Sequence, residues 1–187
     1  MQSRAIPDNR ISASSSQQPA IAARLQSVLS WCAYSSDSNP YLQIDLGSDH
    51  VVCAVATQGN NAVDQWVTSY RISTSSDGML WTTYTENNIT KTFYGNYDRS
   101  TMARHVLYHC PITRNIRIEP ITYQGIPCLR TEIYGYQLQP RNSDKTTVVT
   151  NAIRNPFIAK FVRVLPTAYK GWIALRVDFK GTSQGIL

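Results

Sequence analysis

The sequence predicts an all-β protein, a sandwich or jelly roll of short strands, and three observations support this prediction. Apolar and polar residues alternate with a period of two in short segments, which places successive side chains on opposite faces of a strand. Turn residues separate these segments. No amphipathic pattern extends beyond two helical turns. Many short strands with turns between them favour two packed sheets over a helical fold.

The individual strands are predicted in chain order. Residues 51–56 are almost entirely apolar, which predicts a strand buried on both faces. Residues 70–74 and 80–84 flank Asp77-Gly78, and because glycine tolerates the positive φ of a tight turn, this arrangement predicts a hairpin. Residues 129–134 and 175–180 alternate between apolar and polar side chains, so each segment predicts a strand.

The composition favours a folded domain and excludes several classes of protein. Of the 187 residues 42% are hydrophobic, and no apolar run approaches the roughly 20 residues of a membrane span. The net charge is +6, but residues 1–139 hold ten Lys or Arg and ten Asp or Glu, so the surplus lies in residues 140–187. There the basic residues are spread singly rather than clustered among stacking aromatics, which argues against nucleic acid as a partner.

Cysteine usage and the start of the chain bear on the compartment. Cys32, Cys53, Cys110 and Cys128 show no CxxC spacing, and the histidines are not spaced with them as zinc ligands, so no metal and no cofactor is predicted. Four cysteines permit two disulfides in an oxidising compartment or, alternatively, four buried thiols. The first ten residues lack the apolar segment of a signal peptide, which fits either a cytoplasmic protein or a piece of a longer secreted one. The second interpretation is preferred.

Asn88-Ile89-Thr90 is a sequon for N-glycosylation in a polar stretch. Such triplets arise often by chance. Together with the even number of cysteines, it favours an extracellular protein with a glycan on Asn88.

An internal repeat occurs at an offset of 46 residues. Residues 96–135 recur without a gap in residues 142–181, with these identities: Asn96 and Asn142, Asp98 and Asp144, Arg117 and Arg163, Pro120 and Pro166, Tyr123 and Tyr169, Gly125 and Gly171, Leu129 and Leu175, Arg130 and Arg176, Gly135 and Gly181. We therefore expect a complete domain over residues 1–139 and an incomplete β tail over residues 140–187. Half a sandwich cannot cover its own apolar face, so the tail should be loosely held, dock on the first domain or pair with another chain.

Several motifs carry a resemblance to a known family. They occur in family order at residues 6–15 (IPDNRISASS), 41–47 (YLQIDLG), 54–59 (AVATQG), 66–70 (WVTSY), 93–96 (FYGN), 117–120 (RIEP) and 132–135 (EIYG). In these segments the chain resembles discoidin domains, also called coagulation factor V/VIII type C domains. The resemblance covers residues 1 to about 139, and the half-repeat resembles the C-terminal portion of the same domain.

The resemblance implies an eight-stranded antiparallel jelly roll, of the galactose-binding-like kind, in a secreted or cell-surface protein. Family members bind phospholipid head groups, glycans, collagen or protein ligands through loops called spikes at one end of the barrel. The disulfide that joins the domain ends in many members is absent, since Tyr136 stands at the second cysteine position. Instead, Cys32 and Cys128 match the positions that pair in some relatives. Cys53 and Cys110 then remain as a second pair or as buried thiols.

Candidate ligand-binding residues follow from these expected spikes. Spike 1, residues 17–31, offers Ile21, Arg24 and Leu25, although Ile21 and Leu25 would equally well pack back onto the barrel. Spike 2, residues 58–66, and spike 3, residues 94–100, offer further candidates: Asn60, Asn61, Asp64, Gln65 and Tyr97. Asn96 and Asp98 in spike 3 suit a local Asx turn better than ligand contact.

Arg117, Arg130 and Glu132 lie on predicted strands and are interpreted as structural, and because buried charges need partners an internal ion pair is expected. No nucleophile elbow or catalytic histidine arrangement is present, so the chain is not predicted to be an enzyme. The leading hypothesis is an extracellular adhesion module that binds a cell-surface or matrix glycan or protein. The alternative is a peripheral module for anionic phospholipid head groups.

Overall fold

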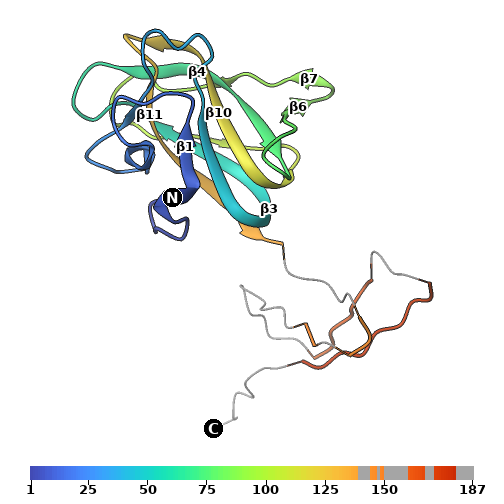
Figure 1. The fold of residues 1–187 in the computed structure, drawn as a ribbon. Helices are drawn as coiled ribbons and strands as arrows, with labels where there is room; N and C mark the ends of the chain where they lie inside the picture. Colours follow the sequence, from blue (N-terminus) through green and yellow to red (C-terminus); the bar gives the residue numbers. More distant parts are fainter. Residues whose placement is uncertain (139–143, 147, 150–159, 167–170, 180–187) are drawn as a thin grey trace.

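The computed structural model describes residues 1–138, 144–146, 148–149, 160–166 and 171–179, and Figure 1 shows the fold. The described chain is all-β and antiparallel, with two short 3₁₀ helices. In order the elements are η1 (Asp8–Arg10), β1 (Ile11–Ala13), η2 (Ala20–Ala23), β2 (Trp31–Cys32), β3 (Leu42–Gln58), β4 (Trp66–Ser75), β5 (Thr82–Thr83), β6 (Thr85–Glu86), β7 (Ile89–Thr90), β8 (Phe93–Tyr94), β9 (Ala103–Val106), β10 (Ile112–Gln124) and β11 (Cys128–Gln137).

The long strand β3 joins the two layers of the sandwich. Its first half pairs with β1 and β10, in the register Ile44 opposite Ile11 and Ile116. Its second half pairs with β11 and β9, in the register Val55 opposite Ile133 and His105. Gly47, with a φ of +84°, lies between the two halves, where the chain has to bend. β10 then continues the first layer to β4 and β5.

The apolar faces of both layers meet in one core. The cluster is built from alternate residues of the long strands together with an aromatic group, and its largest fully buried members are Trp31, Leu42, Ile44, Val52, Val55, Tyr70, Ile72, Phe93, Leu107, Ile116, Ile118 and Leu129. The rings of Tyr70 and Phe93 stack with centroids 5.4 Å apart. Among the described residues, every member of this core lies within residues 1–138.

Most of the predicted strands are confirmed. Residues 51–56 lie within β3, and residues 129–134 lie within β11. The hairpin around Asp77-Gly78 joins β4 to β5, with Ser73 opposite Thr83. The Asp77 carboxylate accepts backbone hydrogen bonds from Met79 and Leu80, which closes the turn. The described strands outnumber the eight expected because several consist of two residues only.

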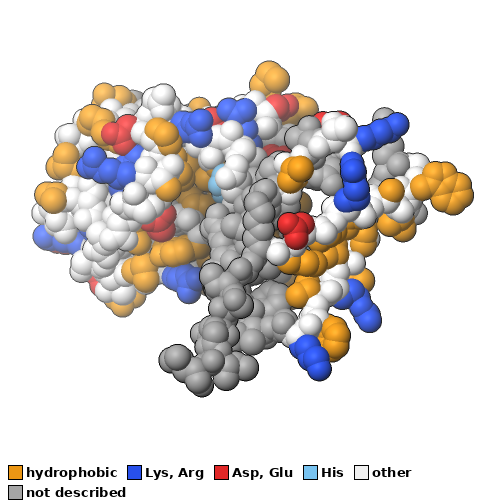
Figure 2. Space-filling model, turned by 90° about the horizontal axis from the view of Figure 1, so that it is seen from below, with side chains coloured by type: hydrophobic (Ala, Val, Ile, Leu, Met, Phe, Trp, Pro, Cys, Tyr) orange, Lys and Arg blue, Asp and Glu red, His pale blue; other side chains and the backbone are white. Residues whose placement is uncertain are grey.

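The strand predicted over residues 175–180 is wrong over the part described, residues 175–179. No strand occurs in the described residues of the tail, and Leu175, Val177 and Phe179 are about half exposed. Figure 2 shows apolar side chains of the tail standing at the surface. Alternation alone does not make a strand, because the backbone groups of a strand also need a neighbour to pair with.

Both cysteine pairs occur as disulfides, Cys32 to Cys128 and Cys53 to Cys110. The first links β2 to β11, whose residues 32 and 128 are also register partners. The second ties β3 to the segment just before β10. Neither 3₁₀ helix, nor any other helix among the described residues, has the length and apolarity that a membrane span needs.

Candidate functional site

The side chain of Arg130 holds three loops together at one end of the sandwich. Its Nε donates to the carbonyl of Gly59 (2.9 Å), Nη1 to that of Ser27 (3.0 Å) and Nη2 to that of Arg99 (2.7 Å). These carbonyls belong to spikes 2, 1 and 3, respectively. Arg130 is only 3% exposed, and burial lowers the pKa of its guanidinium, which remains charged at neutral pH. One buried cation therefore fixes all three spikes by their backbones.

Gln58 adds a second link between spikes 1 and 3. Its amide oxygen accepts a hydrogen bond from the backbone N–H of Gln26, and its Nε2 donates to the carbonyl of Ser100 at 2.7 Å. Gln58 and Arg130 are register partners on β3 and β11, so both links start from neighbouring points of the sheet. The loops are thus mounted on the rigid part of the fold.

Spikes 2 and 3 also contact each other directly. Arg99 Nε donates to Asp64 Oδ1 at 2.6 Å, and Arg99 Nη1 donates to the carbonyl of Ala62 at 3.3 Å. The hydrogen bond from Arg99 lowers the pKa of the Asp64 carboxyl and raises the pKa of the Arg99 guanidinium. Both side chains are exposed, so the pair orders the loop surface without contributing much to stability.

The tips of the three spikes expose apolar and aromatic side chains. On spike 1 these are Val28, 77% exposed, and Leu29; on spike 2, Val63; and on spike 3, Tyr97, 75% exposed. Asn61 is also exposed and precedes Ala62, whose carbonyl accepts a hydrogen bond from Arg99. The sequence analysis did not single out Val63 or Arg99. The opposite charges of Asp64 and Arg99 on two neighbouring spikes were the available signal for the second.

Three of the predicted ligand-binding residues face inward instead. Leu25 is 4% exposed and Arg24 is 8% exposed, and Arg24 is engaged by the carbonyls of Met1 and Ile6 and by the Asp8 carboxylate. Asn60 is 9% exposed, with its Nδ2 3.1 Å from Gln65 Oε1 and 3.6 Å from Cys32 Sγ. These side chains support the loops and do not reach the surface where a ligand would lie.

The remaining predicted residues lie at or near the surface. Ile21 is 37% exposed at η2, Asn61, Asp64 and Tyr97 are exposed, and Gln65 is half-buried. Asn96 is 4% exposed and donates to the carbonyls of Thr57 and Thr101.

The turn interpretation of Asp98 agrees with the structure. Its carboxylate accepts hydrogen bonds from the backbone N–H groups of Ser100 and Thr101 and from the Thr101 hydroxyl. The hydrogen bonds from Thr101 hold the pKa of the Asp98 carboxyl below its ordinary value. Asp98 thus shapes spike 3 from within the loop.

The side chains of Arg117, Arg130 and Glu132 do not form ion pairs with one another in the described chain. The Arg117 guanidinium lies between the rings of Tyr41 and Trp81, 3.9 and 3.8 Å from their centroids. Arg130 binds backbone carbonyls, as above, and Glu132 binds the amino group of Met1 (2.5 Å) and the backbone N–H of Gln2. The structural role stands. The internal ion pair that was expected forms between Glu132 and the Met1 amino group, whereas aromatic and backbone partners satisfy the two arginines.

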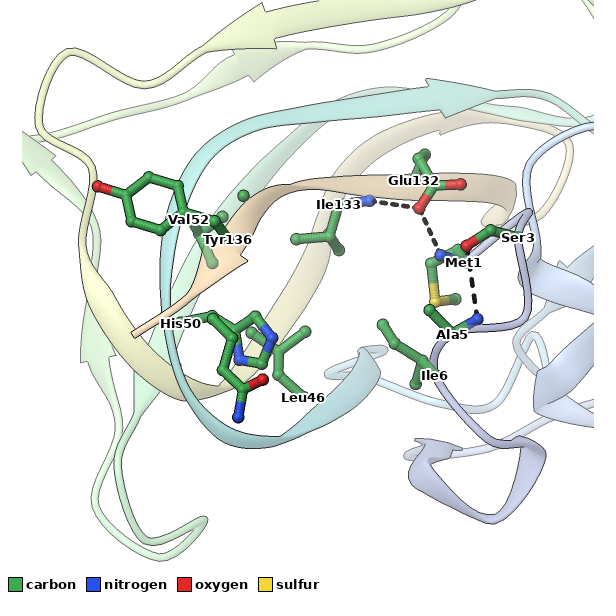
Figure 3. Close-up of a pocket in the computed structure, with 12 residues that line it drawn as sticks. Met1, Ser3, Ala5, Ile6, Leu46, His50, Val52, Glu132, Ile133 and Tyr136 are labelled. Carbon is green, nitrogen blue, oxygen red and sulfur yellow. Dashed lines mark hydrogen bonds and ion pairs between the residues drawn. The ribbon is translucent and has the colours of Figure 1, made fainter. Parts of the chain in front are cut away.

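A separate pocket of about 300 Å³ lies where the N-terminal segment meets β3 and β11 (Figure 3). Ile6, Leu46, Val52 and Ile133 form apolar walls, and Glu132 is already occupied by the Met1 amino group. None of the predicted binding residues lines it. The pocket is lined by β11 from Glu132 onward, whereas Arg130 and the spikes lie at the preceding end of that strand.

The sequon lies at the tip of a two-residue hairpin. β6 and β7 pair with Glu86 opposite Ile89, and Asn87 and Asn88 have φ values of 52° and 62°. Asparagine tolerates these left-handed conformations better than most residues. Asn88 and Thr90 are both exposed, so the acceptor amide is accessible.

Comparison with known proteins identifies relatives of this arrangement. Residues 10–133 match the F5/8 type C domain family. Lactadherin from Mus musculus is 32% identical over 145 residues, which cover 70% of this chain and 31% of lactadherin. Contactin-associated protein 1 from Homo sapiens is 37% identical over 115 residues, which cover 60% of this chain and 8% of that protein. The chain therefore corresponds to a third or less of the length of these relatives.

Solved structures show the same fold. Discoidin II of Dictyostelium discoideum has a TM-score of 0.63 at 24% identity, covering 69% of this chain and 56% of discoidin II. A family 32 CBM from C. perfringens NanJ, solved in complex with galactose, has a TM-score of 0.51 at 22% identity, covering 68% of this chain and 97% of that module.

Proposed function

Since this chain belongs to the F5/8 type C domain family, we propose that it is an extracellular, non-catalytic module that binds a glycan or protein ligand through its three spikes. The observation that carries the proposal is the Arg130 clamp. A buried guanidinium that fixes three loops by their carbonyls lowers the entropy lost when those loops bind something. The two disulfides fit the oxidising conditions outside the cell.

The cationic side chains at the spikes already have partners, which favours an uncharged ligand. Arg24 forms an ion pair with Asp8, and Arg99 forms one with Asp64. Arg130 donates its hydrogen bonds to backbone carbonyls. These three cations are therefore not offered to an anionic head group. Tyr97 offers a ring face, and Asn61 offers amide donors and an acceptor beside Asp64. Such side chains suit sugar hydroxyls or a polar protein surface.

The test is binding of the full chain to arrays of glycans and of matrix proteins. We expect a positive signal that falls at least tenfold in Tyr97→Ala and in Asn61→Ala. Tyr108→Ala is the matched control, because Tyr108 is 74% exposed but lies outside the spikes. Equal binding by the Tyr97 and Tyr108 variants would place the ligand elsewhere on the domain.

A membrane function is the second candidate, and the exposed spike tips favour it. Val28 and Leu29 on spike 1 and Val63 on spike 2 are exposed apolar side chains at loop ends, where they would meet the acyl boundary of a membrane. Sedimentation with vesicles of phosphatidylcholine, with and without phosphatidylserine, separates the candidates. Binding only in the presence of phosphatidylserine, and lost in Val28→Ser with Leu29→Ser, would replace the leading proposal with the membrane one.

We also propose that Asn88 carries an N-linked glycan. The supporting observation is its exposed place at the tip of the β6–β7 hairpin, with Thr90 accessible. Protein secreted from eukaryotic cells should lose mass on treatment with an N-glycosidase. Asn88→Gln should remove that shift, whereas Asn87→Gln, one residue away and outside the sequon, should retain it.

Finally, we propose that residues 140–187 are a partial second F5/8 type C domain. Two contacts in the tail repeat contacts of the first domain at the offset of 46. Thr146 N–H donates to Asp144 Oδ1 at 2.8 Å, as Ser100 N–H does to Asp98. Arg176 Nη2 donates to the carbonyl of Lys145 at 2.7 Å, as Arg130 does to Arg99. Gly171 and Gly125 also share a positive φ, 75° and 69°.

The partial domain is tested by the amide of Thr146. If Asp144 caps it as Asp98 caps Ser100, then Asp144→Asn and Asp98→Asn should each shift the corresponding amide proton resonance in the same direction. A Thr146 resonance unchanged in Asp144→Asn would argue against the second copy.

A further inference from the structure

The tail exposes the residues that the first domain buries at the equivalent positions. In the first domain Ile116 and Ile118 on β10 and Leu129 on β11 are fully buried. At the offset of 46 their counterparts are Val162, Val164 and Leu175, which are 47%, 45% and 47% exposed. The apolar pattern of a core face is therefore present in the tail, where these three side chains are about half exposed.

The sheet topology specifies what is missing. β10 and β11 are not neighbours in the first domain, because β3 lies between them and pairs with both. The tail carries the counterparts of β10 and β11 but no counterpart of β3, since the second copy begins at residue 142, directly after the first domain ends. The two tail segments therefore cannot form a sheet with each other in the family register.

The tail is also barred from taking over the β3 of its own domain. Cys53 on β3 is bonded to Cys110, and Cys32 on β2 is bonded to Cys128 on β11. Both disulfides thus connect residues 1–95 to the segment that the tail repeats. The tail has Pro156 and Ala174 where that segment has Cys110 and Cys128, so it cannot replace these links. In a second, oxidised copy of the chain, the Cys53–Cys110 disulfide holds β3 in the same way.

We infer that residues 160–166 and 171–179 are an acceptor for one extended strand of the β3 type, donated by a different polypeptide that carries the N-terminal half of an F5/8 type C fold. The donated strand would pair with residues 161–166 on one side and residues 173–179 on the other, and would cover Val162, Val164 and Leu175. Addition of a strand to unpaired backbone is an established mode of protein recognition. This inference rests on the proposed partial second domain.

The probe is a synthetic peptide of residues 41–58 with Cys53→Ser, added to the oxidised full chain. Trp172 is the reporter, because it is 92% exposed in the tail and the peptide contains no tryptophan. We expect saturable binding at one peptide per chain, with a blue shift of tryptophan emission that is absent in Trp172→Phe. A peptide of the same composition in scrambled order should bind at least tenfold more weakly.

The matched variant is Val162→Asp with Leu175→Asp, which should weaken peptide binding at least tenfold and leave the thermal unfolding of residues 1–138 unchanged. As its control, Val148→Asp, at an exposed tail position outside the two segments, should bind normally. Equal binding by the double variant, or no binding of the peptide, would overturn the inference. So would a dimer of the full chain that buries Trp172 without any peptide.

These outcomes are separable from the other proposals. Tyr97→Ala should leave peptide binding unchanged, and the tail variants should leave binding to the arrays unchanged. If the amide of Thr146 reports the Asp144 cap but the peptide does not bind, then the partial domain stands and strand donation fails.

Discussion

Residues 115–133 and residues 161–179 share a pattern of apolar, arginine and glycine positions, but they differ in secondary structure and in burial. The first segment forms much of β10 and β11 and supplies core residues that are fully buried. The second forms no strand over the residues described and leaves its apolar side chains about half exposed. The two segments have the same sequence pattern, but over the part of the chain that is described only the first has a neighbouring strand to pair with. In the first segment both strands pair with β3, which lies between β10 and β11, whereas the described residues of the tail contain no strand that could act as such a partner.

Removing a crosslink should affect the first segment most. The Cys32–Cys128 disulfide spans a sequence separation of 96 residues. In the chain-entropy model, a loop of that length contributes about 4–5 kcal/mol to the free energy of unfolding. Cys32→Ala with Cys128→Ala should lower the denaturant midpoint accordingly. An unchanged midpoint would show that the hydrogen bonds of the sheet alone set the stability of this segment.

A matched pair of truncations sharpens the comparison. Ile116→Ala deletes a fully buried side chain and should cost about 2–5 kcal/mol of stability, by lost burial and by the cavity that remains. Val162→Ala, at the equivalent position in the tail, should change the unfolding of the first domain by less than about 0.5 kcal/mol. Chemical denaturation followed by near-ultraviolet circular dichroism measures both. Similar losses for the two variants would mean that the tail packs against the first domain.

Arg130 and Arg176, which occupy equivalent positions 46 residues apart, give the next contrast. Arg130→Lys keeps the charge but cannot reach three carbonyls with one planar fork, so it should cost about 1–3 kcal/mol and reduce ligand binding by the spikes. Arg176→Lys should affect neither property. Calorimetry and the array assay test both, and a binding loss without a stability loss in Arg130→Lys would point to direct ligand contact.

The smallest expected effect is a dependence on pH in spike 3. The hydrogen bonds from Thr101 lower the pKa of Asp98 below the ordinary value of 3.8. A carboxyl whose pKa is depressed by folding contributes stability above its unfolded pKa and loses it as the pH falls through the folded value. Spike 3 should therefore keep its turn at neutral pH and loosen only below about pH 3.8. Titration of the Asp98 carboxyl by NMR checks this, and a midpoint at or above the ordinary value would contradict it.

The jelly roll, the hairpin at Asp77-Gly78 and the Cys32–Cys128 pair were predictable from the sequence, because alternation, turn residues and family motifs are local signals. The pairing of Cys53 with Cys110 was left open, because no family motif indicated it. The inward direction of Leu25 was left open and that of Asn60 was not predicted, since loop residues have no periodicity that assigns them to a face. The Arg130 clamp was hidden for another reason. Its partners are backbone carbonyls, which every residue has, so the residue types at positions 27, 59 and 99 do not predict the contact.

β3 also has a mechanical consequence. Its two halves belong to opposite layers, so one covalent backbone runs from the first layer to Gln58 beside the spikes. A pull on a bound ligand would pass through Arg130 and Gln58 into this backbone and load the ladders of both layers in shear. Such a load would act along β3 on its pairings with β1 and β10 in one half and with β9 and β11 in the other.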